Sequence, residues 1–121
     1  MSRTATAYQR LNEKYLKDAQ ALMRKEDYSQ ASEKLWGAAA EIVKAVAMKR
    51  ENKEIGEHRL LFDYVSRLDK EFPHLNLKRL FMTARLLHTN FYEDELPADY
   101  VRDLAFRDVT EFVDKIRKFL E

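Results

Sequence analysis

Apolar residues recur at intervals of three and four along nearly the whole chain, and this period constrains the fold more than any other feature. Such spacing places them on one face of an α-helix, which has about 3.6 residues per turn. No segment alternates apolar and polar residues for long, and no Asn-Gly or Asp-Gly pair marks a hairpin. With only two glycines and two prolines to interrupt it, the sequence predicts an all-α protein.

Cap and turn signals divide the first half of the chain into two helices. We expect the first over residues 4–25. Asp27 followed by Gln30 has the arrangement of a capping box, which would start a second helix ending near Arg50. Asn52 is suited to the left-handed position just after that helix.

Prolines and an asparagine delimit three further helices. Pro73 disfavours helical geometry at Phe72 and so ends the third. Asn76 is a natural N-cap for the fourth, and Pro97 suits the first position of the fifth, which runs to the C-terminus. Because short links join long helices, we expect a single antiparallel bundle of about five helices, with residues 1–121 forming one domain.

Two local patterns predict contacts between helices. Gly37 lies in an alanine-rich part of the second helix and would let a neighbour approach closely, which must offset the roughly 1 kcal/mol cost of glycine there. On the fifth helix, Phe106, Val113 and Leu120 widen the apolar arc beyond the roughly 100° that a core-facing helix needs. Either a second neighbouring helix or a partner would cover this surplus; we favour a homodimer, since most small oligomers are symmetric pairs.

The charge balance limits the partners. There are 22 basic and 21 acidic residues, a formal net charge of +1, so there is no general attraction to nucleic acid or anionic membrane, and RNA would need a local patch. The chain has no cysteine, which excludes disulfides, thiolate zinc sites and cysteine nucleophiles. Its high share of charged residues, 36%, favours a thermophilic source.

No targeting or membrane segment is expected. The N-terminus lacks the apolar core of a signal peptide. The most apolar stretch, residues 35–48, contains Glu41 and Lys44 and so cannot be a transmembrane helix. We therefore expect a cytoplasmic protein.

Sequence motifs for common active sites are missing. The chain has no phosphate-binding glycine loop, no His-Glu-x-x-His and no nucleophile elbow, so we expect no cofactor and no metal. His58 and His88 each lie on an otherwise apolar helix face, whereas His74 lies in a turn and should be solvated. A core-facing histidine is more often structural than catalytic. If His58 and His88 met, they could share a water, a metal or a proton, although no ligand pair at i, i+4 supports a metal.

Arg85 and His88 are the candidate catalytic residues. They are three residues apart on a helix and hence neighbours on its surface; Tyr92 continues the row, while Asn90 lies on a different face. An arginine with a histidine is the minimum for metal-independent RNA cleavage, with histidine as acid or base and arginine holding the phosphate. The same pair also fits a buried polar network between helices, which we favour.

Two segments carry a family resemblance: YSQASEKLWGAA at residues 28–39 and LHTNFYE at residues 87–93. Through them the chain resembles the archaeal PaREP repeat-family proteins, which belong with the HEPN-like helical bundles. The likeness covers nearly the whole chain. It implies a bundle that dimerises through its helices, with a small nucleotidyltransferase as a possible partner, as in toxin–antitoxin modules.

The resemblance also bears on activity. In active HEPN ribonucleases an arginine and a histidine meet at the dimer interface, at a longer spacing than that of Arg85 and His88, which have two residues between them. This departure favours a non-catalytic dimeric module that binds a protein partner or a nucleotide-bearing ligand. The alternative is a metal-independent endoribonuclease that uses Arg85 and His88.

Overall fold

The computed structural model describes residues 3–121, and within them every regular element is helical. This confirms the expected all-α bundle. The principal helices are α1 (Ala5–Arg24), α2 (Tyr28–Glu51), α3 (His58–Glu71), α4 (Leu77–Glu93) and α5 (Phe106–Arg117). Three short elements accompany them: the 3-10 turns η1 (Pro73–Leu75) and η3 (Lys118–Leu120), and the π-helical turn η2 (Tyr100–Ala105).

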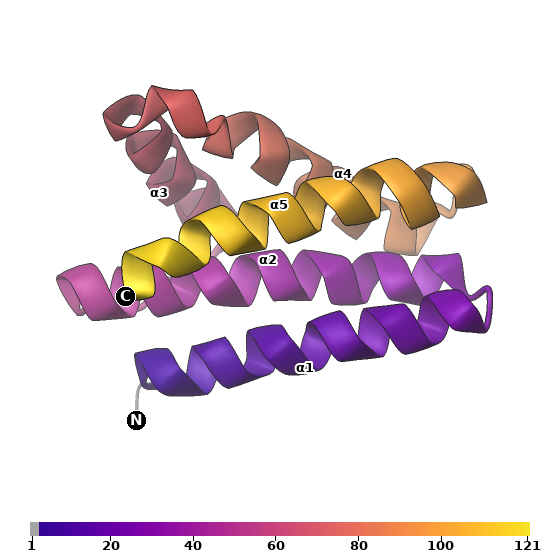
Figure 1. The fold of residues 1–121 in the computed structure, drawn as a ribbon, viewed down its shortest axis with the longest axis horizontal. Helices are drawn as coiled ribbons and strands as arrows, with labels where there is room; N and C mark the ends of the chain where they lie inside the picture. The colour runs from indigo at the N-terminus through magenta and orange to yellow at the C-terminus, as the bar shows by residue number, and fades with distance from the viewer. Residues whose placement is uncertain (1–2) are drawn as a thin grey trace.

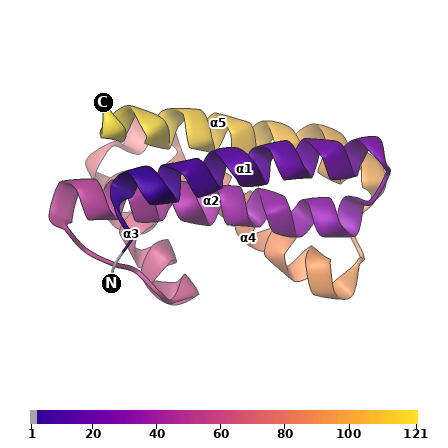
Figure 2. The same cartoon turned by 90° about the horizontal axis from the view of Figure 1, so that it is seen from below.

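The helices are arranged around α2. Figure 1 shows α1 antiparallel to α2 and α5 running along α2 in the same direction as it, while α3 and α4 lie behind. In Figure 2, α5 and α4 appear on either side of α2. The start of α1 and the C-terminus lie at one end of the bundle. Helix α2 therefore contacts each of the other principal helices.

Burial on all sides explains the central place of α2. Its residues Leu35, Ile42 and Val46 are fully buried, and it packs against α1, α3, α4 and α5. A helix that is apolar all round is stable only inside a protein. Within residues 3–121, no helix combines the length and the apolar character needed to cross a bilayer.

Helices α1 and α2 approach each other closely at Gly37, as expected. A Cβ atom there would lie 2.9 Å from Cδ2 of Tyr15, closer than such contacts allow. Next to it, Nδ2 of the buried Asn12 donates to the carbonyl oxygen of Ala38 at 2.7 Å. The missing side chain lets the Tyr15 ring lie against the backbone of α2, and this contact shapes the cleft described below.

The residues that begin and end α2 are largely those predicted from the sequence. Asp27 Oδ1 accepts from the Gln30 N–H at 3.2 Å, which confirms Asp27 as the N-cap. The reciprocal half of the capping box is wrong, because the Asp27 N–H donates instead to the Leu22 carbonyl at 2.9 Å. Asn52 has the expected left-handed backbone, with φ 50°.

Asn76 occupies the N-cap position of α4, as predicted, but the expected side-chain cap is wrong. Its backbone is left-handed, with φ 57°, and its side chain makes no capping hydrogen bond. N-cap residues usually need extended backbone geometry to direct their side chain at the helix amides. Asp69 of α3 takes over this role: its Oδ1 accepts from the Lys78 N–H at 3.1 Å.

The last helical segment differs from the regular helix that the sequence predicted. It begins at residue 98, so Pro97 precedes the helix rather than opening it, and the Pro97 carbonyl accepts from the Val101 N–H at 3.2 Å. The π-helical turn η2 follows, before α5. In this wider turn Val101 and Ala105 are both fully buried.

The wide apolar arc of α5 is covered by the chain itself. Val113 is 1% exposed, and Phe106 and Leu120 pack against the core while partly buried. Helix α5 touches both α2 and α4, which agrees with a helix wedged between two neighbours. The arc thus needs no second copy of the chain to cover it. The homodimer stays a prediction, which rests on the family resemblance.

Candidate functional site

Two histidines from different helices meet above the tryptophan of α2. The ring centroids of His58 (α3) and His88 (α4) are 4.8 Å apart, with planes at 87°. The Trp36 ring lies 4.9 Å from His58 and 5.2 Å from His88. Together with Glu33, these residues are called the histidine cluster below. The structure thus brings together the two imidazoles whose meeting the sequence left open.

The histidines occupy different positions on their helices. His88 is partly buried within α4, as its apolar surroundings predicted, with 18% of its side chain exposed. His58 is the first residue of α3 and exposed, so its expected place within an apolar face is wrong. Trp36 is 4% exposed and also packs on Phe81 at 5.6 Å, so it belongs to the core.

Glu33 orients His88. The Nδ1 atom of His88 lies 3.1 Å from Oε1 of Glu33. A carboxylate oxygen accepts this hydrogen bond, so Nδ1 is the donor and Nε2 is not engaged by Glu33. A carboxylate behind an imidazole is the arrangement that fixes the tautomer of acid–base histidines. Sequence reasoning missed Glu33, since it precedes His88 by 55 residues.

His58 stays neutral at neutral pH. Its pKa lies below the ordinary 6.5, first because the ring loses hydration and then because His88, Arg85 and Lys44 disfavour a further positive charge. The residue as a whole is exposed, but its ring packs against Trp36 and His88. At pH 7 the cluster therefore offers a neutral imidazole beside one that is held by a carboxylate.

Arg85 and Tyr92 flank the cluster on α4. Arg85 is exposed and makes no hydrogen bond or ion pair within the described part of the chain, yet its charge contributes to the lowered pKa of His58. Tyr92 is 69% exposed, and its ring lies 5.5 Å from that of His88. The predicted row on α4 therefore lies at the site, whereas His74 is exposed in the separate turn η1.

The cluster lacks the geometry of a metal centre. Across residues 3–121, no three His, Asp or Glu side chains are placed to hold a metal ion. The two imidazoles are perpendicular, and Glu33 is hydrogen-bonded to one of them. The histidine cluster is therefore suited to hydrogen bonding and proton exchange.

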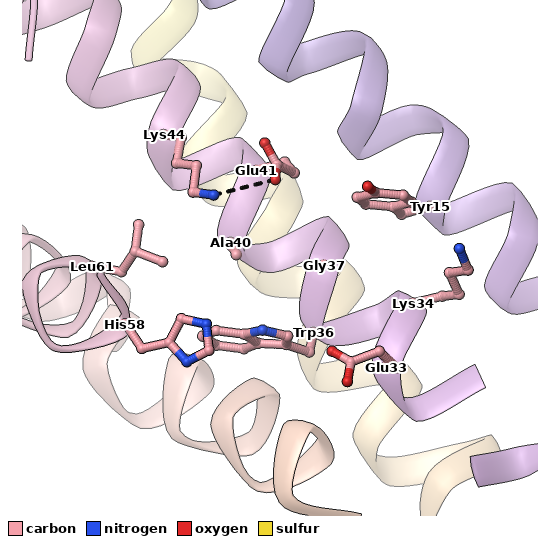
Figure 3. A pocket seen from close by; sticks show the side chains of 10 residues that line it. All are labelled: Tyr15, Glu33, Lys34, Trp36, Gly37, Ala40, Glu41, Lys44, His58 and Leu61. Atoms are coloured by element: carbon pink, nitrogen blue, oxygen red, sulfur yellow. Dashed lines mark hydrogen bonds and ion pairs between the residues drawn. The ribbon is translucent and has the colours of Figure 1, made fainter. Parts of the chain in front are cut away.

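A cleft of about 220 Å³ opens beside the cluster, between α1, α2 and α3 (Figure 3). Its charged residues are two carboxylates and two ammonium groups, and the Lys44 Nζ contacts Oε1 of Glu41 at 3.4 Å. The polar and aromatic lining consists of Tyr15, Glu33, Lys34, Trp36, Glu41, Lys44 and His58. Because three of these also belong to the histidine cluster, the two features form one continuous site.

Asn90 supports the end of α4 that carries His88. It is 1% exposed; its Nδ2 donates to the Ser32 hydroxyl at 3.0 Å, and its Oδ1 accepts from the amides of Glu95 and Leu96 at 2.9 and 2.8 Å. Sequence reasoning placed Asn90 off the row of His88 but gave it no role. The lone side-chain amide of this helix, just before an acidic turn, was the available signal.

The chain is similar to known archaeal proteins in sequence and in fold. The sequence profile of the archaeal PaREP1/PaREP8 family matches residues 7–115. A crystal structure of a protein from Sulfolobus solfataricus is similar with a TM-score of 0.79 and 25% sequence identity, over 92% of this chain and 97% of that one. No curated protein matches the sequence. The family match includes every residue of the histidine cluster.

Proposed function

The chain belongs to the archaeal PaREP1/PaREP8 family, and we propose that it is a non-catalytic, HEPN-like helical module that binds a nucleotide-bearing ligand. The ligand would occupy the histidine cluster and the adjoining cleft. The observation that carries this proposal is the convergence of two imidazoles and an indole, from three helices, at the mouth of a cleft of mixed charge.

The phosphate of such a ligand would lie at the outer side of the cluster. Arg85 is exposed there, and its guanidinium presents paired N–H donors that match phosphate oxygens. The neutral imidazole of His58 adds a further N–H donor. Since the net charge of the chain is only +1, this recognition would depend on local groups rather than on a general field.

The base would lie in the cleft. Ligand sites in proteins are concave and mostly apolar, with a few polar groups that set the orientation. The cleft has an aromatic wall from Tyr15, and both hydrogen-bond donors and acceptors among its charged residues. Aromatic side chains hold nucleobases by stacking, at about 1–3 kcal/mol per base.

The three histidines make a direct test possible by NMR. Titration with a panel of ribonucleotides is expected to shift the imidazole signals of His58 and His88, while those of His74 stay in place. Arg85→Ala should weaken the binding at least roughly ten-fold, or about 1.4 kcal/mol, whereas His74→Ala should leave it unchanged. Equal shifts at all three histidines, or none at all, would rule out this site.

A second candidate function is metal-independent RNA cleavage by Arg85 and His88. The hydrogen bond from His88 to Glu33 favours it, because it leaves Nε2 available as a general base. Incubation of structured and unstructured RNA with the native protein and with His88→Ala decides between the two functions. We expect equal background cleavage; cleavage by the native protein alone would establish the ribonuclease instead.

The proposal includes a homodimer, with a small nucleotidyltransferase as a possible further partner. Because the core covers the arc of α5, the surface available to a second copy is apolar side chains exposed elsewhere, such as Met82 and Leu86 of α4, which are 50% and 40% exposed. Exposed apolar residues in proximity favour association. Light scattering is expected to give twice the chain mass, and Leu86→Glu to return it to that of the monomer; a monomer at high concentration would contradict the dimer.

A further inference from the structure

Glu41 is the unusual residue of the cleft. It lies in the most deeply buried part of α2, and 9% of its side chain is exposed. One carboxylate oxygen, Oε1, contacts the Lys44 ammonium at 3.4 Å, but Oε2 has no hydrogen-bond partner among residues 3–121. A buried acceptor without a partner lowers stability, and more so when it is charged. The chain therefore keeps a costly polar group at the cleft.

The charges that line the cleft indicate which kind of hydrogen-bond donor would suit Glu41. Glu33 and Glu41 are balanced by Lys34 and Lys44, so the lining has no surplus negative charge that would select a cation. A neutral N–H group is the better donor for Oε2. The same ligand should carry an acceptor for the Lys44 ammonium, which lies beside Glu41 in Figure 3.

We propose that the cleft binds the base of a guanine nucleotide, with Glu41 and Lys44 reading its Watson–Crick edge. This rests on the proposed function and adds the identity of the base. Lys44 Nζ and Glu41 Oε1 lie side by side as a donor and an acceptor, and Oε2, which is sealed from solvent in this conformation, becomes a second acceptor once the carboxylate turns toward the cleft. Guanine presents the complementary order: the O6 acceptor, the N1–H donor and the N2 amino donor.

The other bases do not match this order. Adenine and cytosine place an amino donor against the ammonium and a ring-nitrogen acceptor against the carboxylate. Uracil matches at O4 and N3–H, but its O2 acceptor faces Oε2. Sites built to pair a polar group reject analogues that leave it unpaired or opposed. The edge therefore favours guanine over all three alternatives.

The size and walls of the cleft suit one base. About 220 Å³ is smaller than the roughly 300–1,000 Å³ of sites for drug-sized ligands, which leaves room for a ring system but not for a whole nucleotide. Figure 3 shows the Tyr15 ring on the α1 side of the cleft, where its contact with Gly37 positions it as a wall. Rotation about the last torsion of Glu41, which is broad and two-fold in character, would turn Oε2 toward the base.

Calorimetry with matched ligands tests the contact without changing the protein. GMP and IMP differ only in the N2 amino group, so we expect GMP to bind at least ten-fold more tightly than IMP, and AMP more weakly than GMP. Equal affinities for GMP and IMP would overturn the assignment of Oε2. If nucleotides bind with shifts at His58 and His88 but show no preference for guanine, the guanine inference fails and the proposed function stands; if none binds, both fail.

Glu41→Gln provides a second, independent test. The amide retains one acceptor and replaces the other with a donor, so GMP affinity should fall at least ten-fold. XMP carries an acceptor at position 2, and it should bind the variant better than the native protein. Glu13→Gln, an equal charge change on the exposed side of α1, should leave both affinities unchanged. Undiminished GMP binding by Glu41→Gln would overturn the proposal.

Discussion

Replacing Phe81 with alanine is expected to lower the free energy of unfolding by about 3–5 kcal/mol, the range found for large aromatic side chains in cores. Phe81 is fully buried in α4, and its ring lies 5.2 Å from Phe112, 5.6 Å from Trp36 and 6.1 Å from Phe62. These contacts join four helices at one point. Truncation would leave a cavity that rigid helices cannot close by moving together.

Urea unfolding followed by circular dichroism measures this loss. The midpoint should fall while the denaturant dependence stays the same, as for a change in stability alone. Leu104→Ala is the control: this residue of η2 is 47% exposed, and its truncation should change stability by no more than about 0.5 kcal/mol. A loss below about 1 kcal/mol for Phe81→Ala would mean that the core tolerates the cavity by rearrangement.

Asn90→Ala is expected to cost about 2–4 kcal/mol, because one truncation removes three hydrogen bonds. The amides of Glu95 and Leu96 would lose the acceptor that fixes the link between α4 and the last helical segment, and the Ser32 hydroxyl would lose its donor. The residue is 1% exposed, so water cannot fully replace these partners.

Hydrogen exchange provides the specific readout for Asn90. The amides of Glu95 and Leu96 should exchange faster in the variant, by more than the overall loss of stability explains. Thr89→Ala, at the exposed neighbouring position, should change neither stability nor exchange by a comparable amount. Unchanged protection at Glu95 and Leu96 would show that the backbone of this link is held by other contacts.

The sequence predicted several residues of the site but not the groups that face them. It selected His58, His88 and Arg85, and the structure places all three in one region. It did not find Glu33 as the partner of His88, nor Glu41 as an acceptor at the cleft, because periodicity says which face a residue occupies but not what faces it. Similarly, Asn76 has the right residue type for a cap, yet Asp69 of the preceding helix fills that role.

The sequence by itself determined the helices, their limits at Asp27, Asn52 and Pro73, and the close approach at Gly37. These follow from hydrophobic period and backbone chemistry, which act over a few residues. Only the tertiary structure decided which helices face each other, that the arc of α5 is covered from within, and that the two imidazoles meet over Trp36. Those outcomes depend on how complete helix surfaces fit together, and packing of that kind joins residues that are far apart along the chain.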